Sequence, residues 1–321
     1  MDSTQRKARA AWISVISNST LVVSKLVIGL LTGSVSVVSE AIHSAVDLLA
    51  SGIALFAVKS ASKPADREHP YGHGKIENLS GSIEATLILV AAAWIVYQAV
   101  HKLIARSPIE MAGLGVAIMA VSAIANHLVS RMLFRVGKET DSIALQADGW
   151  HLRTDVWTSA GVMTGLAVIM LSRWLVPAWD LWWLDPVAAL AVAALIVKAA
   201  FHLTRQSLGD VIDASLPEEE QRWIDDLVRT VPGVFGFHGL RTRKAGAQRF
   251  VEFHLLVDRG LSVAASHKLS HDVSDAIEKR FSGASVTIHV EPCDGSCPAD
   301  CLAGCLLDTQ QREAMREAPL T

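Results

Sequence analysis

The segment Ser39–Ser51, SEAIHSAVDLLAS, places two ionisable side chains, His43 and Asp47, inside a long apolar run. Residues four apart in an α-helix lie one above the other on the same face. A second apolar run contains the same pair at the same spacing, His151 and Asp155. An ionisable group in hydrocarbon costs about 2.5–3.5 kcal/mol on insertion scales, so four of them need a stabilising partner. A shared cation would supply it, and two imidazoles with two carboxylates suit Zn²⁺.

The composition is that of an integral membrane protein. The 321 residues are 51% hydrophobic and only 19% charged, with a mean hydropathy of +0.34. Six apolar runs reach the length of about 17–25 residues that crosses a bilayer. We place these runs at residues 11–32, 36–58, 80–103, 111–133, 143–172 and 186–204. Residues 1–10 are basic and lack a cleavage site, so we expect the first run to be a retained span and not a signal peptide.

The distribution of basic residues predicts the orientation of the spans. Lysine and arginine gather before the first run, between the second and third, and between the fourth and fifth. Because basic loops stay in the cytoplasm, we expect both termini and residues 1–10 to be cytoplasmic. An interfacial aromatic belt is expected on the opposite side, formed by Trp174, Trp179, Trp182 and Trp183.

After residue 206 the composition changes to that of a soluble domain, which we place at residues 207–292. The pattern predicts a helix from about 217 to 230, strands at 234–243 and 249–257, a helix at 264–281 and a strand at 286–290. This α-β-β-α-β order indicates a small α+β domain with its helices on one face of a sheet. The six spans at residues 11–206 would form the transmembrane domain.

Two further groups of residues have the chemistry of metal ligands. Asp66, His69 and His73 lie in a Gly- and Pro-rich loop that can wrap around one ion, and the alternative is a solvated polar loop. The soluble domain holds His238, His254 and His289 on predicted strands, His267 and His271 on a predicted helix, and Glu291. Strands of one sheet lie about 4.8 Å apart, so the strand residues can converge on a metal. The alternative for each histidine alone is a structural role.

All four cysteines fall in the C-terminal tail, residues 293–321, at Cys293, Cys297, Cys301 and Cys305. They cannot cross-link the rest of the fold, so no disulfide framework is indicated. Four thiolates in so short a segment suit Zn²⁺ or another soft ion. The spacing is not that of a zinc ribbon, and a disordered cysteine-bearing tail is the alternative.

These motifs together resemble the cation diffusion facilitator family, specifically its bacterial zinc and ferrous-iron efflux type. The resemblance spans roughly residues 8–293. It rests on GSVS at 33–36, on His43 and Asp47, on HPYGHGKIE at 69–77, on ADGWHLRTD at 147–155 and on HGLRTR at 238–243.

The resemblance implies a homodimer of six-helix subunits that exports a divalent metal ion in exchange for protons. Its cytoplasmic domain would be metallochaperone-like. The implied transport site is His43, Asp47, His151 and Asp155, and the implied loop site is Asp66, His69 and His73. The implied cytoplasmic site binds two metals near the dimer interface through His238, His254, His267, His289 and Glu291. Lys75 and Asp213 match a charged pair that interlocks the dimer.

This chain departs from the members most similar to it at two positions. Those members carry a carboxylate where His43 stands, and the set of two His and two Asp resembles the zinc-preferring branch of the family. Glu291 stands where the matching members have Asp. We therefore expect Zn²⁺ as substrate and regulatory ligand, with protons as the counter-ion.

An enzyme is not expected, because the chain has no H-E-x-x-H motif and four ligands leave no position for a catalytic water. The alternatives are a membrane metal sensor, or an efflux carrier with Fe²⁺, Cd²⁺ or Mn²⁺ as its main substrate. The expected location is the bacterial inner membrane. Lipid, divalent metal ions and a second copy of the chain are the expected partners, and nucleic acid is not.

Overall fold

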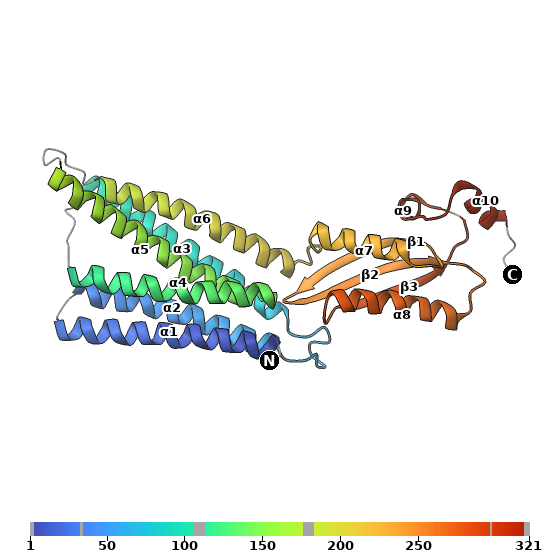
Figure 1. Cartoon of the computed structure of the whole chain (residues 1–321), viewed down its shortest axis with the longest axis horizontal. Coiled ribbons are helices and arrows are strands. Elements are labelled where there is room, and N and C mark those ends of the chain that lie inside the picture. The colour runs from blue at the N-terminus through green and yellow to red at the C-terminus, as the bar shows by residue number, and fades with distance from the viewer. Residues whose placement is uncertain (1–2, 33–34, 106–112, 176–182, 296, 318–321) are drawn as a thin grey trace. The chain divides into compact units, whose positions relative to one another are not determined.

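The computed structural model describes residues 3–32, 35–105, 113–175, 183–295 and 297–317 (Figure 1). Within these ranges nothing is described of the side chains at 32, 35–40, 42, 43, 46, 113–116, 162, 165–175, 184, 185 and 300. Trp174, Trp179 and Trp182 of the expected aromatic belt therefore lie outside the description, whereas Trp183 is exposed. The chain divides into two compact units, Met1–Val211 and Ile212–Thr321.

The first unit consists of long helices that match the expected apolar runs. They are α1 (Ser3–Thr32), α2 (Val35–Ala61), α3 (Lys75–Ala105), α4 (Gly113–Glu139), α5 (Ile143–Leu175) and α6 (Leu184–Val211). Most extend beyond the run that predicted them, because helical hydrogen bonding continues into polar residues at their ends. Over the described residues, four segments are long and apolar enough to cross a membrane: Ser3–Leu31, Lys75–Ala105, Ala117–Glu139 and Pro186–Val211.

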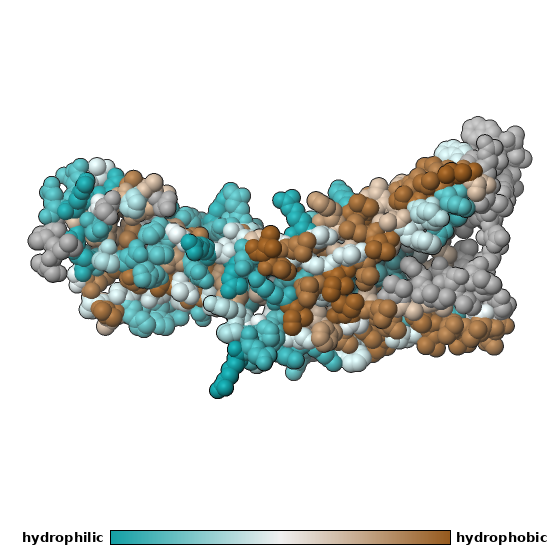
Figure 2. Space-filling model, turned by 180° about the vertical axis from the view of Figure 1, so that it is seen from behind, coloured by the Kyte–Doolittle hydropathy of each residue, from teal (hydrophilic) through white to brown (hydrophobic). Residues whose placement is uncertain are grey.

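Small residues let these helices approach one another closely. One buried cluster contains Ala10 and Ala57, and a second contains Ala85, Ala147 and Ala200. Such residues are typical of helix contacts in membranes, where dispersion and close packing replace the hydrophobic effect. Large apolar side chains are instead exposed on the outside of this unit, and Figure 2 shows brown patches on the face that it draws. The unit thus presents an apolar surface to lipid.

Buried polar side chains link the helices of this unit. Lys7 Nζ lies 2.9 Å from Glu77 Oε1, and both side chains are almost fully buried. Asn18 donates to Ser51 Oγ at 2.6 Å, and Ser51 donates to Asp148 Oδ1 at 2.9 Å. Because water is absent from hydrocarbon, each of these groups needs a protein partner. The links therefore fix which helix faces meet.

The second unit has the α-β-β-α-β order that the sequence predicts. Its elements are α7 (Glu218–Thr230), β1 (Val234–Ala245), β2 (Gln248–Val257), α8 (Val263–Arg280) and β3 (Ser285–Pro292). The sheet order is β1-β2-β3, with β1 and β2 antiparallel and β2 and β3 parallel.

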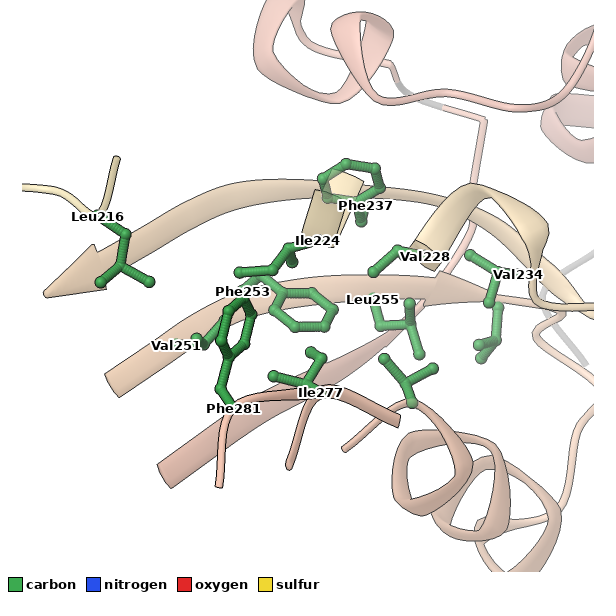
Figure 3. Packing of buried hydrophobic residues seen from close by; sticks show 12 residues of the cluster. Leu216, Ile224, Val228, Val234, Phe237, Val251, Phe253, Leu255, Ile277 and Phe281 are labelled. Carbon is green, nitrogen blue, oxygen red and sulfur yellow. The ribbon is translucent and has the colours of Figure 1, made fainter. Parts of the chain in front are cut away.

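Both helices of this unit share one core with the sheet (Figure 3). Alternate residues of β2, including Val251, Phe253 and Leu255, pack with Ile224 of α7 and Ile277 of α8. Side chains alternate between the two faces of a strand, so the other residues of β2 project from the opposite face. The prediction that the helices lie on one face of the sheet is confirmed. The opposite face is not covered by these two helices.

The tail contains two helices that the sequence reading did not predict, α9 (Ala299–Ala303) and α10 (Thr309–Glu317). Asp308 Oδ1 accepts a hydrogen bond from the main-chain N–H of Gln311 at 2.7 Å, and Gln311 Oε1 accepts one from Asp308 N at 2.9 Å. This reciprocal capping box starts α10. A disordered tail is therefore not what the structure shows over the residues it describes.

Leu255→Ala should destabilise the second unit by about 2–5 kcal/mol, because it removes a fully buried side chain and leaves a cavity. Hydrogen exchange of the β2 amides in the full chain measures the loss. Leu261→Ala is the matched control, since Leu261 is 39% exposed, and it should change stability by no more than about 0.5 kcal/mol. Equal effects of the two substitutions would contradict this description of the core.

Candidate metal sites

A buried cluster of ligand atoms lies between α2 and α5. Asp47, His151 and Asp155 each offer one atom, and these atoms all lie within 4.8 Å of one another. His151 Nε2 is 3.2 Å from Asp47 Oδ1, and these two residues are 5% and 4% exposed. His151 Nδ1 is buried with no hydrogen-bond partner among the described atoms. A buried, unpaired imidazole nitrogen is costly, which suits a site that gains a ligand.

The structure does not describe the side chain of the fourth expected ligand, His43. Its main chain lies in α2, four residues before Asp47. The helix thus places His43 and Asp47 on one face, and only this placement supports His43 as a member of the cluster.

A cavity of about 400 Å³ adjoins the cluster and is lined by both Asp47 and Asp155. Other polar residues in its wall are Lys25, Asn126, Thr154 and Thr158. A water molecule occupies about 30 Å³ in the liquid, so the cavity can admit a hydrated cation. Lys25 Nζ lies 2.8 Å from Ser44 Oγ, so this lysine of α1 has a polar partner on α2.

The second cluster lies in the loop between α2 and α3. Asp66, His69 and His73 offer ligand atoms that also lie within 4.8 Å of one another. His69 Nδ1 is 3.5 Å from Asp66 Oδ1, and His73 Nε2 is 3.4 Å from Asp66 Oδ2. A hydrogen bond from the main-chain N–H of His69, 2.7 Å long, lowers the pKa of the Asp66 carboxyl below its ordinary value. The carboxylate is therefore kept in the charged form that binds metal.

The third cluster forms on the face of the sheet opposite the helices. His238 of β1 pairs in register with His254 of β2, which pairs in register with His289 of β3. Glu291 follows two residues later on β3, on the same face as His289. His238, His254 and Glu291 offer ligand atoms within 4.8 Å of one another.

Glu291 connects all three histidines of this row. Its Oε2 lies 3.1 Å from His238 Nε2, while its Oε1 lies 2.7 Å from His254 Nδ1 and 3.5 Å from His289 Nε2. The hydrogen bond with His254 is the largest effect that lowers the pKa of the Glu291 carboxyl below its ordinary value of 4.5. The longer glutamate side chain thus reaches the histidine row.

A bulge in β1 aims His238 into this cluster. The register of β1 against β2 shifts between His238 and Arg241. Gly239 lies in the bulge at φ +65°, and a Cβ atom there would lie 3.2 Å from His254 Cδ2. Glycine therefore supplies a backbone conformation that other residues adopt at a cost, and it leaves room for the His254 ring. The sequence reading did not single out Gly239.

Other expected site residues lie apart from these clusters. His267 is exposed on α8, with its ring centroid 4.6 Å from that of His271, and it does not join the row of histidines. Lys75 Nζ donates to the main-chain oxygen of Val211 at 3.1 Å. Asp213, in the other unit, lies 3.6 Å from Arg243 Nη1.

Comparison with known proteins identifies the family. Residues 11–211 match the family model of the cation efflux transmembrane domain, and residues 216–293 match that of the cation efflux protein cytoplasmic domain. The chain belongs to the cation efflux, or cation diffusion facilitator, family. It is therefore a transporter-family protein and not an enzyme, with helical membrane spans and a cytoplasmic C-terminal domain. The predicted membrane-helical fold with a small α+β domain is confirmed.

Relatives match most of the chain. The transporter sll1263 of Synechocystis is 40% identical over 82% of this chain and 83% of its own length. The cation-efflux pump FieF of Citrobacter koseri is 31% identical over 89% of this chain and 93% of its own length.

Two solved structures match a smaller share of the chain. A structure of CzrB, described as a candidate zinc transporter, is 38% identical and covers 24% of this chain and 98% of its own, with a TM-score of 0.24. The metal-bound C-terminal domain of CzcD from Thermotoga maritima is 32% identical and covers 23% of this chain and 87% of its own, with a TM-score of 0.22.

Glu291→Gln should make the free energy of unfolding of the cytoplasmic unit depend less on pH in the acid range. The pKa of the Glu291 carboxyl is lowered in the folded state. The stabilisation that this carboxylate provides is therefore fully present above the ordinary pKa of 4.5, and it is lost as the pH falls through the lower pKa of the folded state. Unfolding of wild type and variant, followed against pH, should therefore converge toward low pH. Parallel pH profiles would contradict the role of Glu291 as the charged partner of the histidines.

Proposed function

We propose that this protein exports Zn²⁺ from the cytoplasm in exchange for protons, through a site made by Asp47, His151 and Asp155 with His43. The observation that carries the proposal is the buried cluster between α2 and α5, beside a cavity whose volume of about 400 Å³ is large enough for a hydrated cation. Ionisable groups at membrane depth face partners or a pathway, and a transported cation is the partner that family membership supports.

The donor set favours zinc among the divalent ions. Mixed nitrogen and oxygen donors, four in number when His43 is included, match the tetrahedral preference of Zn²⁺. Mg²⁺ and Ca²⁺ prefer oxygen ligands alone and higher coordination numbers. Fe²⁺ and Mn²⁺ bind such sites more weakly than Zn²⁺ in the usual order of affinities.

Competition between metal and protons for the same atoms would couple the two fluxes. Imidazole has an ordinary pKa of about 6.5 and binds metal only in its neutral form. A proton arriving at His151 from outside would therefore displace the metal, and the return of the empty site would carry the proton inward. His151 Nε2 lies 3.2 Å from Asp47 Oδ1, so this carboxylate would stabilise a proton that the ring gains.

The other two clusters would sense cytoplasmic metal. We assign residues 11–206 to transport and residues 207–292 to regulation and dimerisation, with residues 1–10 and 293–321 as cytoplasmic ends. Metal bound by His238, His254 and Glu291 would bring two subunits together, with His267 and His289 binding a second ion near their interface. The loop cluster would relay this closure, and Lys75 and Asp213 would hold the dimer at the inner membrane surface.

His151→Ala and Asp155→Ala should each abolish Zn²⁺ flux, because each removes one of the three ligand atoms that lie within 4.8 Å of one another. The measurement is Zn²⁺ uptake into proteoliposomes with an acidic lumen, read by an enclosed zinc indicator. His202→Ala is the matched control, since His202 is exposed on α6, and it should transport like wild type. Size-exclusion chromatography checks that each variant remains a folded dimer.

The same assay separates transport from sensing and from a channel. Flux retained in a folded His151→Ala protein would contradict the site. No flux in wild type would indicate a sensor. Zn²⁺ movement that an imposed pH gradient cannot drive uphill would indicate a channel.

His43→Asp should gain Cd²⁺ transport in this assay. The substitution replaces an imidazole with a carboxylate and gives the site three carboxylates, at positions 43, 47 and 155. Competition between Zn²⁺ and Cd²⁺ in wild type and variant measures the change. No gain of Cd²⁺ flux would show that selectivity lies elsewhere.

A further inference from the structure

A stripe of basic side chains lies on the exposed face of α4 near the end of that helix. Arg131, Arg135 and Lys138 are spaced by four and three residues, so they share one face of the helix. All three are exposed, and Glu139 is the only acidic residue in the sequence of α4. The Glu139 carboxylate accepts a hydrogen bond from Arg6 of α1, so it is already paired outside this basic stripe.

A fourth cation, Arg153 of α5, reaches the same stripe. Its guanidinium carbon lies 4.5 Å from the centroid of the Phe134 ring and 5.9 Å from the centroid of the Trp150 ring. Phe134 belongs to α4 and follows Arg131 by three residues, one turn along that helix. Side chains of a helix tilt toward its N-terminus, so Arg153 extends toward the start of α5. Its guanidinium group therefore lies beside the basic stripe.

The helices α4 and α5 approach each other closely at this point. Ser130 Oγ donates to the main-chain oxygen of Gly149 at 2.9 Å. A Cβ atom at Gly149 would lie 3.4 Å from the Phe134 ring, so the ring packs on the main chain of α5. Phe134 and Trp150 also meet edge to face, with ring centroids 5.2 Å apart. The surface against which Arg153 lies is thus built from both helices and is well packed.

The basic stripe lies at the cytoplasmic end of the membrane unit. The domain that follows α6 is cytoplasmic, and Figure 1 shows consecutive helices of the membrane unit running in opposite directions. The helix α4 therefore ends, and α5 begins, on the cytoplasmic side. At a rise of about 1.5 Å per residue, Arg131 lies about 12 Å from the end of α4 and Lys138 lies at that end. We therefore expect the stripe to span the depth of the inner-leaflet headgroups.

The protein supplies no anion to these cations within the part of the chain that the structure describes. There, none of Arg131, Arg135, Lys138 and Arg153 forms an ion pair or a hydrogen bond with a carboxylate. Like charges four residues apart on a helix repel, so an anion between them would remove an unfavourable interaction. A guanidinium group at membrane depth also needs a partner, and an aromatic ring provides only part of the stabilisation. Both arguments indicate an anion from outside the chain.

We propose that Arg131, Arg135 and Arg153 bind the phosphate group of an anionic phospholipid of the inner leaflet. Guanidinium groups match the geometry of phosphate through paired hydrogen bonds, and they stack on aromatic rings at the same time. Basic clusters at the cytoplasmic end of a membrane helix attract anionic lipids. Solvation by cytoplasmic water would account for the exposed side chains of α4, but not for Arg153, which is half-buried against two aromatic rings. The proposal does not depend on the transport site.

The aromatic rings beside Arg153 suit an acyl chain of the same lipid. Trp150 and Trp157 are seven residues apart on α5, about two turns, and both are half-buried. Their ring centroids are 6.0 Å apart. Because α5 begins on the cytoplasmic side, Trp157 lies deeper in the membrane than Trp150. A lipid whose phosphate binds the arginines would therefore place an acyl chain along these rings and contact both α4 and α5.

Native mass spectrometry of the delipidated, full-length protein, titrated with phosphatidylglycerol, tests the proposal. Binding should saturate at one tightly bound phosphatidylglycerol per chain. Phosphatidylcholine has the same acyl chains and phosphate but carries a fixed cation beside the phosphate, so it should bind at least about fivefold more weakly. Inorganic phosphate at an equal concentration should not displace phosphatidylglycerol, because it has no acyl chain to bind along the aromatic rings.

Three variants of the stripe and a matched control locate the site. Arg131→Gln, Arg135→Gln and Arg153→Gln should each weaken phosphatidylglycerol binding about fivefold, the effect of one basic residue near an anionic surface. Arg205→Gln should bind like wild type and is the control, because Arg205 is likewise exposed near the cytoplasmic end of its helix, α6.

The exposed arginines keep the test valid if Arg153→Gln disturbs the packing of α4 on α5, because Arg131→Gln and Arg135→Gln change only exposed side chains. Equal affinity of wild type for phosphatidylglycerol and phosphatidylcholine would overturn the proposal, and so would binding by the Arg131 and Arg135 variants as tight as that of Arg205→Gln. Displacement of phosphatidylglycerol by inorganic phosphate at an equal concentration would indicate a site for a free anion and would also overturn it.

Discussion

The contact between His151 and Asp47 is the constraint on which the membrane unit depends. Two ionisable side chains, each almost fully buried, meet at 3.2 Å across α2 and α5. An ionisable side chain without a partner is energetically costly in hydrocarbon, so α2 and α5 must lie close enough for these two side chains to touch. Ala57 of α2 and Ala144 of α5 are buried in one cluster and permit that separation. Hydrogen bonds from Asn18 through Ser51 to Asp148 link α1, α2 and α5. A cation that replaced the contact between His151 and Asp47 would therefore need little rearrangement of the helices around it.

In the cytoplasmic unit, a sheet holds the candidate metal-binding residues together. Its helices pack on one face, and the row of His238, His254 and His289 occupies the other. Registered strands place successive imidazoles side by side, and Glu291 reaches across them. The proposed ligands are thus carried by strands, and the bulge at Gly239 lies next to one of them. Rigid support of this kind lowers the cost of organising a metal site.

Local patterns in the sequence predicted the helices, the strands and the shared faces. The spacing of His43 from Asp47 and of His151 from Asp155 identifies two polar faces, and the predicted strands carry His238, His254 and His289. Spacing alone does not show which elements become neighbours. It therefore could not separate His267, which lies on a helix that packs against the opposite face of the sheet, from the row of His238, His254 and His289. The start of α10 was not predicted, although Asp308 and Gln311 have the spacing of a capping box. This helix buries none of its residues and so shows no apolar face in the sequence.

The most direct test of the transport site is the position of bound zinc in crystals of the full-length protein grown with Zn²⁺. Anomalous diffraction measured on both sides of the zinc absorption edge locates the ion independently of the atomic coordinates. A peak bonded to Asp47, His151 and Asp155 at about 2.0–2.2 Å, with His43 as the fourth ligand, is the result expected. Zinc found at the loop and sheet clusters but absent between α2 and α5 would contradict the account.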